Sequence, residues 1–182
     1  YKYLSSPAGT FGGWLSNDIL EPAHARLLGS YLTELGSLTW RFNPYDELVS
    51  KAGVAPTKED ETHAIELTAG FEAIFKTWTK GHRSAAKKAK KEGVEIKLAD
   101  SQQDWDAYFT AYEDSLHRWG SKASSRYRKS LFDEIRTRNS PNIALWLAFY
   151  KDRVIAGSLC FYSSQHVVYW HGAALHEFFN LR

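Results

Sequence analysis

The chain has 182 residues, of which 43% are hydrophobic and 24% are charged, and its formal net charge is +2. This balance argues against a disordered or membrane class, and the longest apolar run, residues 143–149, is far shorter than the roughly 20 residues of a membrane span. Because the molecule is nearly neutral, any attraction to phosphate must come from a local patch. The single cysteine, Cys160, excludes an internal disulfide and predicts a reducing, cytoplasmic location.

In the first half of the chain, apolar spacing and turn residues predict three strands and three helices. The strands are residues 10–16, 38–42 and 63–69, and the helices are residues 22–35, 45–52 and 71–78. Pro22 lies where the first turn of a helix tolerates proline. Phe71, Phe75 and Trp78 follow the helical repeat, so we expect the third helix to pack into the core.

The second half has a clearer pattern. Residues 94–99 alternate as a strand, a capping box at residues 101–104 opens a helix that ends at Gly120, and a second helix begins at Ser124 or Ser125. Three strands follow, at residues 143–150, 154–162 and 166–174. The links KDR and SSQ are too short for a parallel crossover, so an antiparallel meander is predicted. The fold class is therefore α/β (α+β), with a mixed, mostly antiparallel sheet flanked by helices.

A basic segment, GHRSAAKKAKKEGVEI at residues 81–96, precedes the first of these strands. On a helix its alanines share one narrow face, and its cations share the neighbouring arc: Arg83, Lys87, Lys90 and Lys91. Like charges at this spacing destabilise a helix by a few tenths of a kcal/mol per pair. Two interpretations remain open, a solvated helix face or a surface that binds the phosphates of a tRNA or a nucleotide.

Three segments carry a resemblance to a known family: SPAGTFGGWLS, HRSAAKKAKKEGVEI and FYKDRVIAGSLCFYSSQHVVYWHGAA. With the order strand, helix, helix, meander, they resemble the Gcn5-related N-acyltransferase (GNAT) superfamily and, within it, the Fem-type peptidyltransferases. That branch carries two such folds in tandem. The resemblance implies that residues 1–80 are the closing part of a first unit. Residues 81–182 would then be the opening part of a second unit, truncated before its closing helices and strands.

The resemblance also implies an activity. Fem-type enzymes use aminoacyl-tRNA to add amino acids to a cell-wall precursor, so the expected reaction is amide-bond formation on an amine. We expect no bound cofactor, with aminoacyl-tRNA or acyl-coenzyme A as co-substrate. The expected partner carries phosphate, as a tRNA or a nucleotide-linked precursor does.

Candidate site residues follow from the same resemblance. In this fold the fourth strand borders the acyl-transfer cleft, and strand alternation puts Val167, Tyr169 and His171 on one face. Tyr169 and His171 are therefore candidates to position or protonate a reacting group, with core packing as the alternative. Gly157 marks a bulge, a close ligand approach or simple packing. Cys160 is expected to be a small core residue, and the histidine spacing predicts no metal site.

Two other functions stay open. An N-acetyltransferase that uses acyl-coenzyme A would hold the pyrophosphate in a glycine-rich loop after the fourth strand. This chain has LHEFFNLR there, so we expect coenzyme A to bind weakly. A non-catalytic nucleic-acid or phosphate-binding module would use the basic segment without any acyl-transfer cleft.

Overall fold

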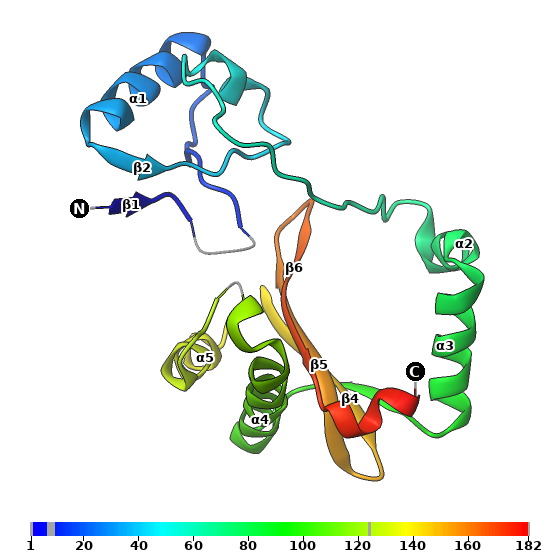
Figure 1. Ribbon diagram of the computed structural model, residues 1–182. Coiled ribbons are helices and arrows are strands. Elements are labelled where there is room, and N and C mark those ends of the chain that lie inside the picture. Colours follow the sequence, from blue (N-terminus) through cyan, green and yellow to red (C-terminus); the bar gives the residue numbers. More distant parts are fainter. Residues whose placement is uncertain (1, 7–9, 124, 182) are drawn as a thin grey trace. The chain divides into compact units, whose positions relative to one another are not determined.

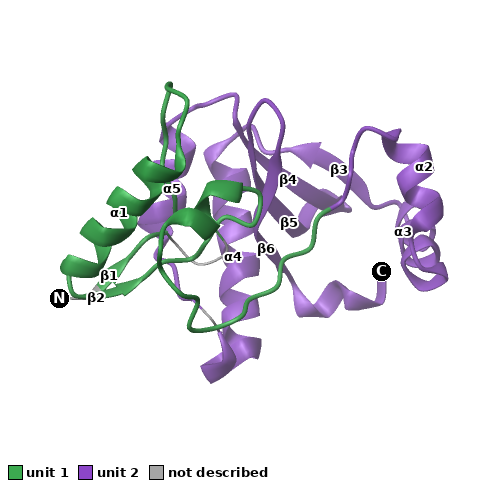
Figure 2. Ribbon diagram, turned by 90° about the horizontal axis from the view of Figure 1, so that it is seen from above, with its two compact units in different colours: residues 1–64 green, residues 65–182 purple. Residues whose placement is uncertain are grey.

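The computed structural model describes residues 2–6, 10–123 and 125–181, and the chain divides into two compact units (Figures 1 and 2). The first unit is Tyr1–Ala64 and the second is Ile65–Arg182. The assignment of residues 1–80 and 81–182 to tandem halves stays a prediction. Within the described ranges, no helix has the length and apolar character needed to cross a membrane.

The first unit combines a long helix with two short parallel strands. Strand β1 (Lys2–Leu4) pairs with β2 (Ser37–Thr39), helix α1 (Pro22–Glu34) lies between them in sequence, and the short 3-10 helix η1 (Glu47–Lys51) follows. Pro22 opens α1 as predicted. A side chain at Gly29 would overlap the carbonyl oxygen of Ala52, so glycine lets α1 pack closely against the residue after η1.

Two strand predictions in the first unit are wrong or too long. Residues 10–16 form only an isolated bridge, between Gly12 and Phe42, and β2 ends at Thr39. The rings of Trp14, Trp40 and Phe42 pack edge to face on one another, with centroids 6.2 and 4.9 Å apart. Aromatic alternation here reflects a small ring cluster and not an extended ladder.

The predicted strand at residues 63–69 is also absent. Residues 61–67 have no regular structure, and Ile65 and Leu67 are 65% and 56% exposed. Alternation of apolar and polar residues produces a strand only when a neighbouring strand supplies hydrogen-bond partners. The pattern alone therefore did not predict the structure.

The second unit contains a four-stranded antiparallel sheet in the order β3-β4-β5-β6 (Figure 2). Its strands are β3 (Glu95–Leu98), β4 (Ile143–Tyr150), β5 (Arg153–Tyr162) and β6 (Val167–Ala174). Its helices are α2 (Gly70–Thr77), α3 (Lys80–Lys91), α4 (Gln102–Trp119), η2 (Gly120–Lys122), α5 (Lys129–Thr137) and η3 (His176–Leu181). The predicted order of strand, two helices and meander is confirmed, as is the fold class. The second helix begins at Lys129 and not at Ser125, and Ser124 lies outside the described residues.

Helices α4 and α5 cover one face of this sheet and form the main core with it (Figure 1). Tyr108, Leu147 and Leu159 are fully buried there, and Tyr112 and Phe132 are 1% exposed. The other face carries apolar side chains that remain open to solvent, including Ile96, Leu98 and Trp146. The sheet therefore has one packed face and one exposed apolar face.

The predicted capping box opens α4. The Ser101 hydroxyl accepts a hydrogen bond from the Asp104 backbone N–H at 3.2 Å, and the Asp104 carboxylate accepts one from the Ser101 N–H at 3.3 Å. We expect Ser101→Ala to lower the free energy of unfolding by about 1 kcal/mol, because the Asp104 backbone N–H at the helix end loses its hydroxyl acceptor. Urea unfolding followed by circular dichroism measures this. A loss below a few tenths of a kcal/mol would show that the box does not stabilise the helix.

Helix α2 forms where predicted, but the prediction that it packs into the core is wrong. None of its residues is buried, and Phe71 is 63% exposed. The rings of Phe71, Phe75 and Trp78 pack on one another, with centroids 5.2 to 6.4 Å apart. Helical spacing identified the apolar stripe correctly, but the stripe is not buried.

Candidate active site

Strand β6 contains a bulge at the residues predicted to form the site. Leu159 on β5 pairs with His171, whereas the next residue, Cys160, pairs with Tyr169, so Trp170 is the extra residue of the bulge. The rings of Trp170 and His171 both lie against Tyr127 and Phe132, on the side of α5.

Tyr169 consequently lies on the opposite face of the sheet from His171. Its hydroxyl rests where a side chain at Gly172 would project. The prediction that Tyr169 and His171 share one face is wrong, because simple alternation treats the bulge residue as an ordinary strand residue. The two candidate residues therefore do not act on one side of β6 together.

His171 is half-buried inside a group of aromatic rings. Its Nδ1 lies 2.5 Å from the hydroxyl of Tyr108 on α4, and the nearest ring centroid, that of Tyr112, is 4.5 Å away. Burial lowers the pKa of His171 to about 4, and burial also raises the pKa of Tyr108. A phenol that holds its proton is the donor, so Nδ1 accepts and the ring proton lies on Nε2.

This environment makes His171 a poor general base. With a pKa of about 4, its imidazole is neutral at physiological pH, but it is too weakly basic to take a proton efficiently from an attacking ammonium. The Nδ1 atom of the neutral ring, its acceptor nitrogen, already accepts a hydrogen bond from Tyr108. The surroundings of His171 suit a role in holding structure better than a role in proton transfer.

Tyr169 has the opposite character. It is 65% exposed, and it lies next to Cys160 across the ladder on the open face of the sheet. Desolvation of its hydroxyl end raises the pKa of Tyr169, although the ring as a whole faces solvent. The phenol therefore stays protonated at neutral pH and can donate a hydrogen bond or a proton.

The basic segment forms α3, capped by the hydroxyl of Thr79, which accepts from the His82 N–H at 3.3 Å. Ala85 and Ala89 are half-buried, while Ala86 is exposed, so the predicted alanine face is narrower than three residues. On the inner side, Lys88 Nζ donates to the Asn180 carbonyl of η3 at 2.6 Å. This bond and the contacts between α3 and η3 hold the helix in the unit.

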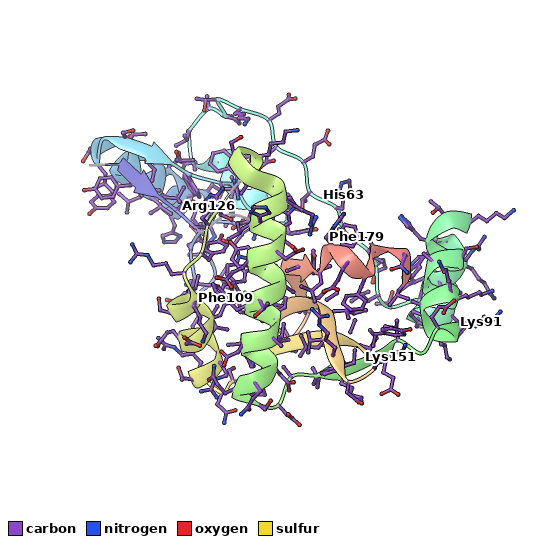
Figure 3. All side chains as sticks on the ribbon, turned by 60° about the horizontal axis from the view of Figure 1, so that its bottom comes forward. His63, Lys91, Phe109, Arg126, Lys151 and Phe179 are labelled. Carbon is purple, nitrogen blue, oxygen red and sulfur yellow. The ribbon has the colours of Figure 1, made fainter. Side chains whose placement is uncertain are left out.

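The four predicted phosphate-binding residues differ in their surroundings. Arg83 is half-buried, and its guanidinium donates to the Lys76 carbonyl at 2.8 Å. Lys87, Lys90 and Lys91 are exposed, and within the described residues none of them forms an ion pair. Figure 3 labels Lys91 at the end of α3. The open part of the basic face is therefore formed by these three lysines.

A pocket of about 280 Å³ lies where α3 leads into β3. It is lined by Glu92, Glu95 and Lys97 on one side and by the β4–β5 turn, with Lys151 and Asp152, on the other. Neither the three exposed lysines nor Tyr169 lines it. The pocket thus does not join the two candidate surfaces.

Comparison with known families decides what kind of domain this is. Residues 78–182, more than half of the chain, match the family described as acetyltransferase (GNAT) domain. The chain belongs to this GNAT family. No curated protein matches the sequence. The matched region includes α3, the four-stranded sheet and both covering helices.

Membership makes this an N-acyltransferase domain. Acyl transfer to an amine requires a neutral amine, a hydrogen-bond donor to the developing oxyanion or leaving group, and close positioning of both substrates. In this GNAT domain, Tyr169 is an exposed donor on β6. Within the described residues, no group of three histidine, cysteine or carboxylate side chains is arranged to hold a metal ion.

The role of Tyr108 at the candidate site of this GNAT domain was not predicted. Tyr108 lies in the helix that the capping box was predicted to open, but its bond to His171 was not expected. The two residues are 63 positions apart in sequence, and no local pattern pairs a helix tyrosine with one particular strand histidine. Gly157 proves to be a packing glycine, since a side chain there would lie 2.6 Å from the ring of Tyr108.

Proposed function

We propose that this GNAT domain forms amide bonds in the manner of the Fem-type peptidyltransferases. An aminoacyl or acyl group would pass from a phosphate-bearing donor, such as an aminoacyl-tRNA, to the amine of a cell-wall precursor or polysaccharide. The observation that carries the proposal is the open basic face of Lys87, Lys90 and Lys91, which is not neutralised within the described residues. Lysines in this state attract a polyanion.

The proposed step assigns Tyr169 as the proton donor. The amine nitrogen attacks the carbonyl carbon, the C–N bond forms and the C–O bond to the donor's ribose breaks. The leaving oxygen takes the phenolic proton of Tyr169. The amine loses a proton to water, and the resulting phenolate of Tyr169 then takes a proton back from water. The raised pKa of Tyr169 keeps the phenol protonated beforehand.

A second candidate is an N-acetyltransferase that uses acetyl-coenzyme A. The description of the matched family as an acetyltransferase favours it. Against it, β6 leads through Leu175 directly into η3, with no glycine between Leu175 and Leu181. Calorimetric titration with acetyl-coenzyme A and with an aminoacylated RNA hairpin separates the two: micromolar binding of acetyl-coenzyme A favours the acetyltransferase.

The basic face is tested by reversing two of its charges. We expect Lys87→Glu together with Lys91→Glu to weaken binding of the RNA hairpin about tenfold or more and to reduce the salt dependence by roughly two counterions. Folding should change little, because both side chains are exposed. The measurement is a titration at several salt concentrations.

The matched control is Lys51→Glu with Lys58→Glu in the first unit. These lysines are also exposed, and both double variants change the net charge from +2 to −2. If binding depends on the α3 face, the control keeps nearly wild-type affinity at physiological salt. Equal losses in both variants, or no loss in either, would return α3 to the interpretation as a solvated face.

A further inference from the structure

We infer that His171 is a positioning residue: together with Trp170 it anchors the β6 bulge to α4 and α5, and the bulge holds Tyr169 on the open face of the sheet. The importance of Tyr169 for transfer rests on the proposed function. The positioning itself rests only on the geometry of β5, β6 and the covering helices.

The first step is what the bulge changes. In a regular strand, Tyr169 and His171 would point to the same side. The face toward α4 and α5 is lined by Tyr108, Tyr112 and Phe132, which are at most 1% exposed, and the rings of Trp170 and His171 both pack there against Phe132. One extra residue lets His171 occupy that face while Tyr169 faces the other way.

The second step is what holds the bulge. The Tyr108 hydroxyl donates to His171 Nδ1, and the centroid of the Phe132 ring lies 5.2 Å from the imidazole. Trp170 packs 5.2 Å from Tyr127 and 5.4 Å from Phe161. A register slip would leave the Tyr108 hydroxyl without its acceptor in the core, which disfavours any other arrangement.

The third step is what the bulge achieves on the open face. The Tyr169 hydroxyl rests over Gly172, where any larger residue would overlap it, and the Tyr169 backbone pairs across the ladder with Cys160. Cys160 is only 9% exposed, although its face of the sheet is open. We therefore expect the Tyr169 ring to limit access to the Cys160 thiol.

Cys160 is the only cysteine of the chain, so its reactivity reports the position of Tyr169 without any added label. The probe is a thiol-reactive aromatic disulfide, which releases a coloured thiolate when Cys160 attacks it. Tyr169→Ala sets the rate with the ring absent. We expect His171→Leu to speed the reaction about tenfold or more toward that rate, because a buried hydroxyl loses its acceptor and the bulge opens locally.

Two further variants separate positioning from packing. His171→Asn keeps an acceptor, its Oδ1, near the Nδ1 position and should return the rate most of the way to wild type. Tyr108→Phe removes only the donor and should speed the reaction with the core volume unchanged; it also serves if His171→Leu does not fold. His117→Leu, the same change at an exposed position of α4, is the control and should leave the rate unchanged.

The rates are measured at several low urea concentrations. A rate that depends little on urea reports local opening, whereas a rate that rises steeply with urea reports global unfolding. Wild-type rates in both His171→Leu and Tyr108→Phe would overturn the inference. Equal rates in His171→Asn and His171→Leu would also overturn it, because only ring packing would then matter. If Tyr169→Phe keeps full transfer activity, the proposed chemistry fails while the cysteine result stands.

Discussion

Gly157→Ala is expected to destabilise the second unit strongly. A methyl group at this position would lie 2.6 Å from the Tyr108 ring and 2.8 Å from Leu147 Cδ2, distances that packed carbon atoms do not tolerate. Neither neighbour can yield easily, because both are fully buried and Tyr108 is also tied to His171. The expected cost is about 3 kcal/mol, the upper end of measured overpacking.

Thermal unfolding measures this effect, and a loss of roughly 10 °C in the midpoint is expected for a chain of this size. Gly81→Ala, in the first turn of α3, is the matched control. Its new methyl group would meet nothing closer than the Thr79 hydroxyl oxygen at 3.9 Å, and alanine favours helices, so its midpoint should stay equal or rise. Equal midpoints for Gly157→Ala and wild type would show that the strand and α4 readjust around the added methyl group.

Much of the second unit could be predicted from sequence because its patterns fix the local backbone geometry themselves. The capping box at Ser101 and the short links between β4, β5 and β6 determine local geometry directly. Residues 63–69 were predicted wrongly, because an alternating segment forms a strand only beside a partner strand, and these residues do not pair as a strand. The aromatic stripe of α2 was correctly placed on a helix, but whether a stripe is buried depends on what the rest of the chain brings to it.

The candidate site was harder to predict than the fold. The bulge at Trp170 depends on how β6 packs on α4 and α5, and alternation alone assigned Tyr169 and His171 to the same face. The basic helix was visible in sequence, but the commitment of Arg83 to the Lys76 carbonyl was not. Long-range pairing of side chains, such as Tyr108 with His171, leaves no signal in residue spacing.

The second large effect is a loss of stability on acidification through His171. Its pKa falls from 6.5 to about 4 on folding, because burial disfavours the imidazolium. Between these pH values the unfolded chain binds a proton that the folded chain does not, so stability falls as the pH falls from about 6.5 to about 4. Above pH 6.5 this residue makes no pH-dependent contribution.

The size of the loss follows from the same two pKa values. At about 1.4 kcal/mol per pKa unit they correspond to roughly 3 kcal/mol, and partial solvent exposure of the ring reduces this to roughly 2 kcal/mol. The polar side chains whose rings face the imidazole are Tyr108, Tyr112 and Tyr127, and none of them is a carboxylate, lysine or arginine.

Urea unfolding from pH 4.5 to 7.5 of wild type and His171→Gln isolates the effect. The other histidines and the carboxylates are common to both proteins, so the difference between the two curves reports residue 171 alone. We expect wild type to lose stability relative to the variant as the pH falls below 6.5, since glutamine cannot take up a proton. Parallel curves would mean that the imidazolium is accommodated among the aromatic rings, whose faces attract cations. In that case acid would leave the β6 bulge and the position of Tyr169 intact.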